Sequence, residues 1–486
     1  MKRCFDARKY LKIQKKKINE RVKMFDKLYL EFGGKLIDDQ HAARTLPGYL
    51  PDLKIQLLQE FKEQAEVILC INADAIEKSK IRADHMITYE TEVIRLIEFL
   101  RAKDITVNTV VITLFNGQKK AEDFAKKLKD YKVKTYFHSF TKGYPTDVDT
   151  IVSDEGYGAN TYIETTKPLV VISAPGPGSG KLATALSQLY HESKRGAKAG
   201  YAKFETFPVW DLPLKHPVNL AYEAATADLD DKNMIDYFHL EKYGKTAVNY
   251  NRDLETFPVL KEILTRISGK SIYNSPTDMG VNVIGQCITD DKAVQKAAKD
   301  EIVRRYLRAL VDLKKGLVPP EVPERIKLLM NELSISEKER AVIAKAEEKR
   351  VKSGCTSACI QVGKKFIVGR KTDYLTAASS VFLNAIKVLT KIPDEVELIS
   401  PTVLAPTLEI KNKTSNFKET HLGLNEVLIA LSICSTTNPL AKKAMESLDK
   451  LAGAEFHSTH MIADDEAVVL ANLGINVTQG AEIDIA

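Results

Sequence analysis

The sequence predicts an α/β protein: a mainly parallel sheet with flanking helices, of P-loop or Rossmann type, followed by a smaller C-terminal α+β domain. Two observations predict this class. Between residues 66 and 195, short apolar runs rich in β-branched residues alternate with segments of helical periodicity, an order typical of parallel sheets with right-handed crossovers. The last of these runs enters a glycine-rich turn followed directly by a helix, and that geometry binds phosphate.

The individual elements follow from two periodicities. A short continuous apolar run indicates a buried strand, and apolar residues three and four positions apart indicate one face of a helix. These rules predict strands over residues 66–72, 107–115, 133–137 and 168–173, and helices over residues 88–103, 119–129 and 181–195. Downstream, residues 200–210 are aromatic-rich and strand-like, Pro217 suits the first turn of a helix, and residues 292–315 form a basic helix.

Changes in composition divide the 486 residues into four expected parts. These are an N-terminal helical arm and loop (1–60), the α/β domain with the glycine turn (61–315), a helical linker (316–353) and the C-terminal α+β domain (354–486). In the linker, Ser336 and Glu339 have the spacing of a capping box that opens a charged helix. In the last part we expect a hairpin turn at Gly363, a strand over residues 397–404 and two helices within 424–452.

Composition indicates an ordinary cytoplasmic protein. The chain is 44% hydrophobic and 28% charged, with a net charge of +6, which is the balance of a globular domain and does not by itself indicate nucleic acid. No run is long enough for a membrane span, and no apolar segment follows the basic start as in a secretory signal. The six cysteines lack a C-x-x-C pair, which favours reduced thiols. We expect a homo-oligomer with closed symmetry.

The first thirty residues combine many lysines with an apolar stripe at helical spacing that includes Ile18, Phe25 and Tyr29. One interpretation is a helix that binds nucleic acid or a membrane surface. The other is an amphipathic helix with a solvated lysine face. The nearly balanced charge of the whole chain favours the second, so no membrane partner and no nucleic-acid partner is expected.

The glycine turn at residues 175–181 is the strongest functional signal. Its expected backbone donors are Gly176, Gly178, Ser179 and Gly180, and Lys181 adds a full charge. The P-loop pattern is incomplete, because proline occupies the position of the first glycine and Leu182 replaces the hydroxyl residue that holds Mg²⁺. The expected ligand is a nucleotide or another phosphate-bearing molecule, with or without Mg²⁺. The alternative is a tight strand-to-helix junction whose glycines are purely steric.

Candidate catalytic residues are Lys181, Glu155, Asp228 and Asp230. Glu155 belongs to the loop 138–166, which is too long for a simple connector. Ligands of open α/β sheets bind beyond the carboxyl ends of the strands, where this loop and the glycine turn would meet. Asp228 and Asp230 belong to a carboxylate cluster of the kind that holds Mg²⁺. The alternative for that cluster is a capped, solvated loop.

Metal binding elsewhere is not expected. His457 and His460 lie three positions apart and would share one face of a helix, but the zinc signature H-E-x-x-H is absent. Cys355 and Cys359 lack common zinc spacing and are expected to be two buried thiols.

Five strings together resemble a bacterial family of cytoplasmic proteins of about this length that carries a domain of unknown function. They are residues 156–158, 174–181, 203–208, 216–220 and 275–282. The resemblance covers the whole chain and implies an α/β N-terminal portion with a separate C-terminal domain. It implies no activity and no catalytic residues.

The function that these observations favour is binding of a phosphorylated small molecule or nucleotide at residues 175–181, by a transferase-type or hydrolase-type enzyme. Whether the chain is an enzyme stays open. Two alternatives remain: a non-catalytic ligand-binding or scaffold protein, and a nucleic-acid-associated protein that uses the basic N-terminal helix.

Overall fold

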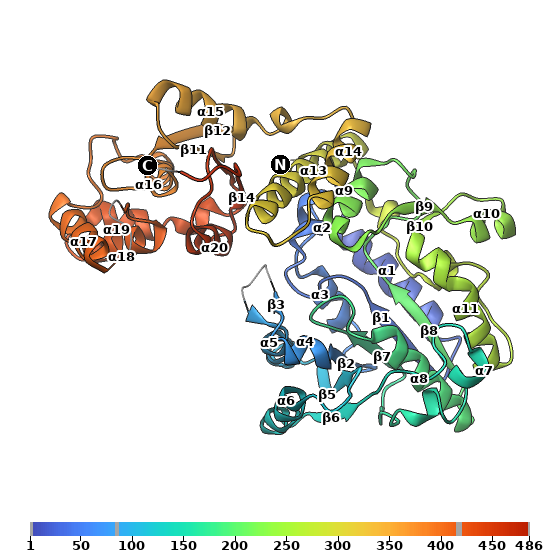
Figure 1. Cartoon of the computed structure of the whole chain (residues 1–486). Helices are drawn as coiled ribbons and strands as arrows, with labels where there is room; N and C mark the ends of the chain where they lie inside the picture. The colour runs from blue at the N-terminus through green and yellow to red at the C-terminus, as the bar shows by residue number, and fades with distance from the viewer. Residues whose placement is uncertain (1–2, 83–86, 415–419, 485–486) are drawn as a thin grey trace. The chain divides into compact units, whose positions relative to one another are not determined.

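The computed structural model describes residues 3–82, 87–414 and 420–484 (Figure 1). The chain divides into two compact units, one extending to Ala298 and one beginning at Lys299. Helix α13 (Asp291–Lys314) runs across this boundary in the sequence.

The first unit is built on a six-stranded sheet with the order β6-β5-β2-β7-β1-β8. Every neighbouring pair in it is parallel, so the predicted α/β fold with a parallel sheet is confirmed. The strands are β1 (Lys27–Phe32), β2 (Ala65–Asn72), β5 (Thr106–Thr113), β6 (Lys134–Phe137), β7 (Leu169–Ser173) and β8 (Ala199–Phe204).

Helices cover both faces of this sheet. The chain passes from β2 to β5 in one direction across the sheet and from β7 to β8 in the other. Since such crossovers are right-handed, the connecting helices α5 (Tyr89–Arg101) and α8 (Lys181–Lys194) lie on opposite faces. On the α8 face, one apolar cluster joins the sheet to α8 and α11 (Asn251–Ser268) through residues such as Tyr29, Ile172 and Phe257.

Further helices and two small antiparallel strand pairs complete the first unit (Figure 1). The helices are α1 (Ala7–Val22), α2 (Gln40–Thr45), α3 (Leu53–Gln59), α4 (Ala73–Glu77), α6 (Lys119–Asp130), α7 (Val148–Ile151), α9 (Pro217–Ala225), α10 (Tyr237–Tyr243) and α12 (Pro276–Met279). Two small antiparallel pairs are β3 (Ile81–Arg82) with β4 (Ile87–Thr88), and β9 (Asn233–Ile235) with β10 (Val248–Tyr250).

Strand β1 is not among the predicted strands, although it lies inside the sheet between β7 and β8. The apolar stripe of the N-terminal segment was assigned to one helix, but α1 ends at Val22 and Tyr29 belongs to β1. The positions of Phe25 and Tyr29 coincide with helical spacing by chance. The aromatic side chains Tyr201, Phe204 and Phe207 are buried in this unit, so they provide no exposed surface for self-association.

The second unit contains a smaller mixed sheet with the order β12-β11-β13-β14. Its strands are β11 (Ser357–Val362), β12 (Lys365–Arg370), β13 (Glu455–Ser458) and β14 (Asn476–Gln479), and β13 and β14 pair in parallel. Val362 pairs with Lys365, so the predicted hairpin turn at Gly363 is confirmed. The helices are α14 (Glu321–Glu332), α15 (Ala341–Ser353), α16 (Ala377–Thr390), α17 (Pro401–Thr414), α18 (Leu424–Ser435), α19 (Pro439–Met445) and α20 (Asp464–Asn472).

Two local predictions in this unit are wrong. Residues 397–404 are not a strand, because Pro401 begins helix α17 and proline suits the first turn of a helix. Ser336 does not open the charged helix with a capping box. It precedes a short 3₁₀ turn without a side-chain cap bond, and α15 begins at Ala341.

Candidate functional site

The glycine turn lies where the strand order of the large sheet reverses. It connects the carboxyl end of β7 to α8. The neighbouring strands β2 and β7 continue in opposite directions, β2 towards β5 and β7 towards β8. In open α/β sheets, ligands bind at the carboxyl edge at such a reversal.

Side chains from neighbouring strands hold the turn through its carbonyl groups. Asn72, at the end of β2, donates to the carbonyl of Gly178 at 3.2 Å. Thr113, at the end of β5, donates to the carbonyl of Ser179 at 2.9 Å, and the Ser179 hydroxyl donates to the carbonyl of Gly176 at 2.6 Å. Within the part of the chain that the structure describes, no acceptor bonds the amide N–H groups of residues 178–181.

The three glycines of the turn serve different purposes. A Cβ on Gly176 would lie 2.4 Å from the Tyr89 hydroxyl, so Gly176 permits close packing. Gly180 has φ +76° and a Cβ there would press against Thr113. Gly178 has φ +69°, but a Cβ there would meet no described atom within 4 Å. Gly178 is therefore the glycine that faces open space.

Lys181 does not extend into solvent. Its ammonium group lies 3.6 Å from a carboxylate oxygen of Glu31, which is on β1. The Lys181 and Glu31 side chains are only 15% and 10% exposed. The Tyr201 hydroxyl, on β8, donates to the other oxygen of Glu31 at 2.8 Å.

A second lysine lies next to this pair. Lys203 on β8 is in register with Glu31, and its ammonium group lies 2.6 and 2.8 Å from the two oxygens of Asp253, in the first turn of α11. The same ammonium lies 3.2 Å from Glu205, whose side chain is 26% exposed. We call these five residues the carboxylate–lysine cluster: Glu31, Lys181, Lys203, Glu205 and Asp253.

Glu205 sits deep beside the end of β1. A Cβ on Gly33 would lie 2.4 Å from Glu205 Cγ, so only glycine allows this approach. Burial raises the pKa of Glu205 to about 7; Lys203 opposes the rise, and Asp253 and Glu31 add to it. An acid that titrates near neutral pH beside a charged group is suited to proton exchange.

Two ionisable groups beside Glu205, Lys203 and Tyr201, have pKa values that are raised further above neutrality. Burial lowers the pKa of Lys203, but Asp253, Glu205 and Glu31 outweigh burial and leave that pKa above its ordinary value. Burial and the Glu31 carboxylate raise the pKa of Tyr201. The lysine therefore stays charged and the phenol stays protonated when Glu205 titrates.

The predicted catalytic carboxylates lie outside this cluster. Glu155 is exposed and paired with Lys142. Its loop packs along the second half of α8, where the Tyr157 carbonyl accepts from Ser187, so the loop does not meet the glycine turn. In the 228–231 loop, Asp230 lies 3.7 Å from Lys232, whereas the buried Asp231 pairs with Arg252 at 2.9 Å, next to Asp253 in the sequence. The third carboxylate, Asp228, lies in a 3₁₀ turn of that loop.

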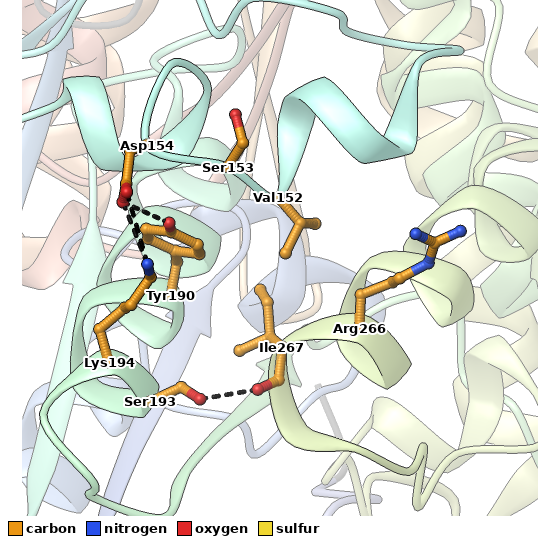
Figure 2. A pocket seen from close by; sticks show the side chains of 8 residues that line it. All are labelled: Val152, Ser153, Asp154, Tyr190, Ser193, Lys194, Arg266 and Ile267. Carbon is orange, nitrogen blue, oxygen red and sulfur yellow. Dashed lines mark hydrogen bonds and ion pairs between the residues drawn. The ribbon is translucent and has the colours of Figure 1, made fainter.

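A separate pocket of about 410 Å³ lies near the other end of α8, away from the turn (Figure 2). Its polar groups already bind one another. Asp154 accepts from the Tyr190 hydroxyl at 2.6 Å and lies 3.3 Å from the Lys194 ammonium, and Ser193 donates to the carbonyl of Ile267 at 2.7 Å. This pocket therefore presents fewer unpaired groups to a ligand than the glycine turn does.

The histidine and cysteine candidates lie in different local surroundings. His457 lies in β13 and not in a helix, its Nδ1 is 3.1 Å from the Thr478 hydroxyl, and burial lowers its pKa to about 3. His460 bonds Thr459. Cys359 is buried, but Cys355 is only half-buried, contrary to expectation. The described residues contain no group of three or more His, Cys, Asp or Glu side chains that could hold a metal ion.

No described helix is long and apolar enough to cross a membrane.

Sequence reasoning missed Glu31, Lys203, Glu205 and Asp253. One signal was available: Lys203 and Glu205 are charged residues two positions apart at the end of an otherwise apolar strand. Charged side chains at that spacing lie on one face of a strand. Glu31 escaped notice because its strand was not predicted, and Asp253 because its contact depends on the packing of α11.

Comparison with known proteins supports the resemblance seen in the sequence. A family model described as "Domain of unknown function DUF1846, N-terminal" matches residues 3–334, and its C-terminal counterpart matches residues 338–484. UPF0371 proteins of the Clostridium botulinum strains Alaska E43 and Eklund 17B are each 53% identical to this chain over 488 residues, covering 98% of this chain and 97% of the relative. A UPF0371 protein of strain Langeland is 53% identical over 484 residues, covering 98% and 96%. The chain therefore carries both DUF1846 domains and belongs to the UPF0371 family.

Proposed function

We propose that this protein binds a phosphate-bearing small molecule at the glycine turn, residues 175–181. One observation carries the proposal. Among the described residues, the amide N–H groups of residues 178–181 have no acceptor, although Asn72 and Thr113 fix the carbonyl groups of the same turn. A turn held by its carbonyls leaves its donors available to an anion.

Two further features favour an anion at this position. The turn precedes the 14-residue helix α8, whose N-terminal dipole attracts negative charge. Lys181 is the first residue of that helix, and a lysine donor shortens and strengthens a hydrogen bond to phosphate. The loose 3.6 Å contact with Glu31 leaves the ammonium able to turn towards a ligand.

The phosphate contact proposed here is made by the chain itself and not through a metal ion at the usual P-loop position. Leu182 occupies that position and packs against the apolar cluster under α8. The nearest hydroxyl on the helix, Thr184, is buried and lies 3.5 Å from the Cys70 thiol. Backbone N–H groups and Lys181 would therefore supply the binding energy.

The carboxylate–lysine cluster favours an enzyme over a passive binding protein. Lys181 belongs both to the turn and to the cluster, so a phosphate at the turn brings the rest of the ligand close to Glu31 and Glu205. Glu205 exchanges a proton near neutral pH. We infer a transferase-type or hydrolase-type reaction on a phosphorylated small molecule, in which a group of this cluster moves a proton.

The test is direct binding. The purified full chain is titrated by calorimetry with inorganic phosphate, pyrophosphate and a panel of nucleoside mono-, di- and triphosphates, with and without Mg²⁺. Saturable binding of at least one phosphate compound, lost in Gly178→Val, supports the proposal. Absence of binding by every compound overturns it. Turnover of a bound compound would separate an enzyme from a non-catalytic binding protein.

A further inference from the structure

The carboxylate–lysine cluster contains one more acid than base. Three carboxylates, Glu31, Glu205 and Asp253, surround the two ammonium groups of Lys181 and Lys203. All five side chains are between 10% and 26% exposed. Bulk water therefore screens them little, and three adjacent carboxylates resist being charged together.

The negative charges of the three carboxylates are not equally stabilised by ion pairs and hydrogen bonds. Asp253 holds both of its oxygens within 2.8 Å of the Lys203 ammonium. Glu31 accepts the Tyr201 hydroxyl at 2.8 Å and also lies beside Lys181. Among the described residues, Glu205 makes one ion-pair contact, with Lys203 at 3.2 Å. Glu205 is therefore the carboxylate on which a proton is held at the least cost.

Lys181 links this balance to the glycine turn. Lys181 is the first residue of α8. Within the described cluster, its ammonium group is the one that contacts Glu31. An anion at the turn competes with Glu31 for Lys181. Once Lys181 bonds the anion, the three carboxylates face Lys203 alone, and the added negative charge increases their repulsion.

We propose, building on the phosphate-binding function above, that binding of a dianionic phosphate ester at the glycine turn is coupled to protonation of Glu205. The proton comes from solvent, and no covalent bond changes. In the complex, Glu205 is a neutral acid that donates its O–H, so it presents a hydrogen-bond donor to the oxygen-bearing part of the ligand. The site thereby prefers ligands whose own acceptor oxygens lie next to the phosphate.

Apart from Asp231, no other group that faces Glu205 is expected to produce the same signal. The titratable and charged groups around it come from β1, β2, α8, β8, α9, the 228–231 loop, β10 and α11: Glu31, Cys70, Lys181, Tyr201, Lys203, Tyr222, Asp231, Tyr250, Arg252 and Asp253. Burial raises the pKa of Cys70 to about 12 and raises the pKa values of the three tyrosines further above their ordinary range. Burial raises the pKa of Asp231 as well, and Arg252, 2.9 Å away, opposes that rise, so the Glu205→Gln variant is needed to separate the proton of Glu205 from that of Asp231.

The experiment uses sulfate, because its charge does not change in the relevant pH range, whereas phosphate itself titrates. Sulfate is titrated into the full chain by calorimetry from about pH 6 to about pH 9. If one proton is taken up, the apparent Kd is flat below about pH 7 and rises about tenfold per pH unit above it. Repeating the titration near pH 8 in buffers of different ionisation enthalpy gives the number of protons, which should approach one per site.

Three variants assign the proton. Glu205→Gln removes the pH dependence and the proton uptake. Glu31→Gln frees Lys181 from its carboxylate, so it binds sulfate more tightly than wild type and takes up less than half a proton. Glu164→Gln is the matched control, an exposed carboxylate paired with Lys134 outside the cluster, and it behaves as wild type. Thermal unfolding verifies that each variant is folded.

The outcomes separate this inference from the function on which it rests. Sulfate binding by wild type with a pH-independent Kd and no proton uptake overturns the coupling but leaves the phosphate site standing. Proton uptake that persists in Glu205→Gln also overturns it. If wild type binds neither sulfate nor any phosphate compound of the panel above at any pH, the proposed function fails and the coupling fails with it. The ligand-free protein can also be titrated by NMR. A carboxyl resonance that titrates near pH 7 in wild type and is absent from Glu205→Gln supports the coupling. A titration midpoint of Glu205 below about pH 5.5 contradicts it.

Discussion

Replacing Lys181 with alanine tests whether the glycine turn binds phosphate or only joins a strand to a helix. If the turn binds an anion, Lys181 adds one charge-assisted contact to several backbone N–H bonds. Such a contact contributes about 1.5–3 kcal/mol, so Lys181→Ala should weaken phosphate binding roughly 10- to 150-fold. The backbone donors remain, so some affinity should survive.

The same substitution also has a cost for folding, which has to be separated from binding. Lys181 and Glu31 are 15% and 10% exposed, so removal of the lysine leaves a buried carboxylate with only the Tyr201 hydroxyl as a short-range donor. We expect the free energy of unfolding to fall by about 1–3 kcal/mol, the usual cost of an underbonded charged acceptor. This loss is expected whether or not the turn binds phosphate.

The assay therefore measures both quantities. Thermal unfolding gives stability, and calorimetry with phosphate and pyrophosphate gives affinity. Lys194→Ala is the matched control, because Lys194 is on the same helix and also pairs with an acid, Asp154, but 57% of its side chain is exposed. It should lose under about 1 kcal/mol of stability and no affinity. If Lys181→Ala is destabilised but binds phosphate as tightly as wild type, the lysine is purely structural and the reasoning is refuted.

Three further predictions follow from the same contacts. Gly178→Val and Gly196→Val should lose similar stability by thermal unfolding, since both glycines have φ near +70 to +80° and open space around a Cβ, but only Gly178→Val should lose phosphate binding by calorimetry. Gly33→Ala should lower the free energy of denaturant unfolding by about 1–3 kcal/mol, because its Cβ collides with Glu205; a neutral result would contradict the close approach. The folded state holds the Glu205 proton up to about pH 7, whereas the unfolded chain releases it near pH 4.3, so the free energy of unfolding of wild type should decrease as the pH rises between those values. Glu205→Gln should raise the free energy of unfolding by about 1–3 kcal/mol near pH 8 but little near pH 5. Equal effects at both pH values would exclude this assignment.

Most of the fold could be predicted from the sequence because its helices and strands have clear local hydrophobic patterns. The strands β2 and β7 are dominated by apolar residues, β5 contains the apolar run 110–112, and α5 has an apolar face that fits one side of a sheet. Such patterns are the primary signal of secondary structure in a sequence. Strand β1 was missed because its residues also fit the spacing of the preceding helix, and the strand over 397–404 was wrong because Pro401 and Ser400 start a helix there.

Only part of the candidate site could be predicted from the sequence. The glycine turn is a contiguous string, so its position and its strand–turn–helix context could be predicted. The cluster beside it is assembled from β1, α8, β8, the residue after β8, and α11. Its formation depends on the strand order β7-β1-β8, which places Glu31 between Lys181 and Lys203. No spacing in the sequence encodes that order, because β1 and β8 are more than 160 residues apart.

The position of the cluster argues for a functional origin. Elsewhere on the α8 face of the sheet, apolar residues such as Ile68, Val170 and Ile172 pack into the core. Buried ion pairs seldom add net stability over apolar residues of similar volume, and a third carboxylate beside two lysines adds repulsion. Folding alone therefore favours apolar or singly charged residues at the positions of Glu31, Lys203 and Glu205. A buried pair at the opposite edge, Lys27 with Glu192 at 2.8 Å, balances one acid against one base. The excess of carboxylates occurs at the carboxyl edge, next to the amide groups of the glycine turn, which is where a parallel sheet binds its ligand. The loss of folding stability that these charged residues cause at this edge is best explained by a ligand that binds there.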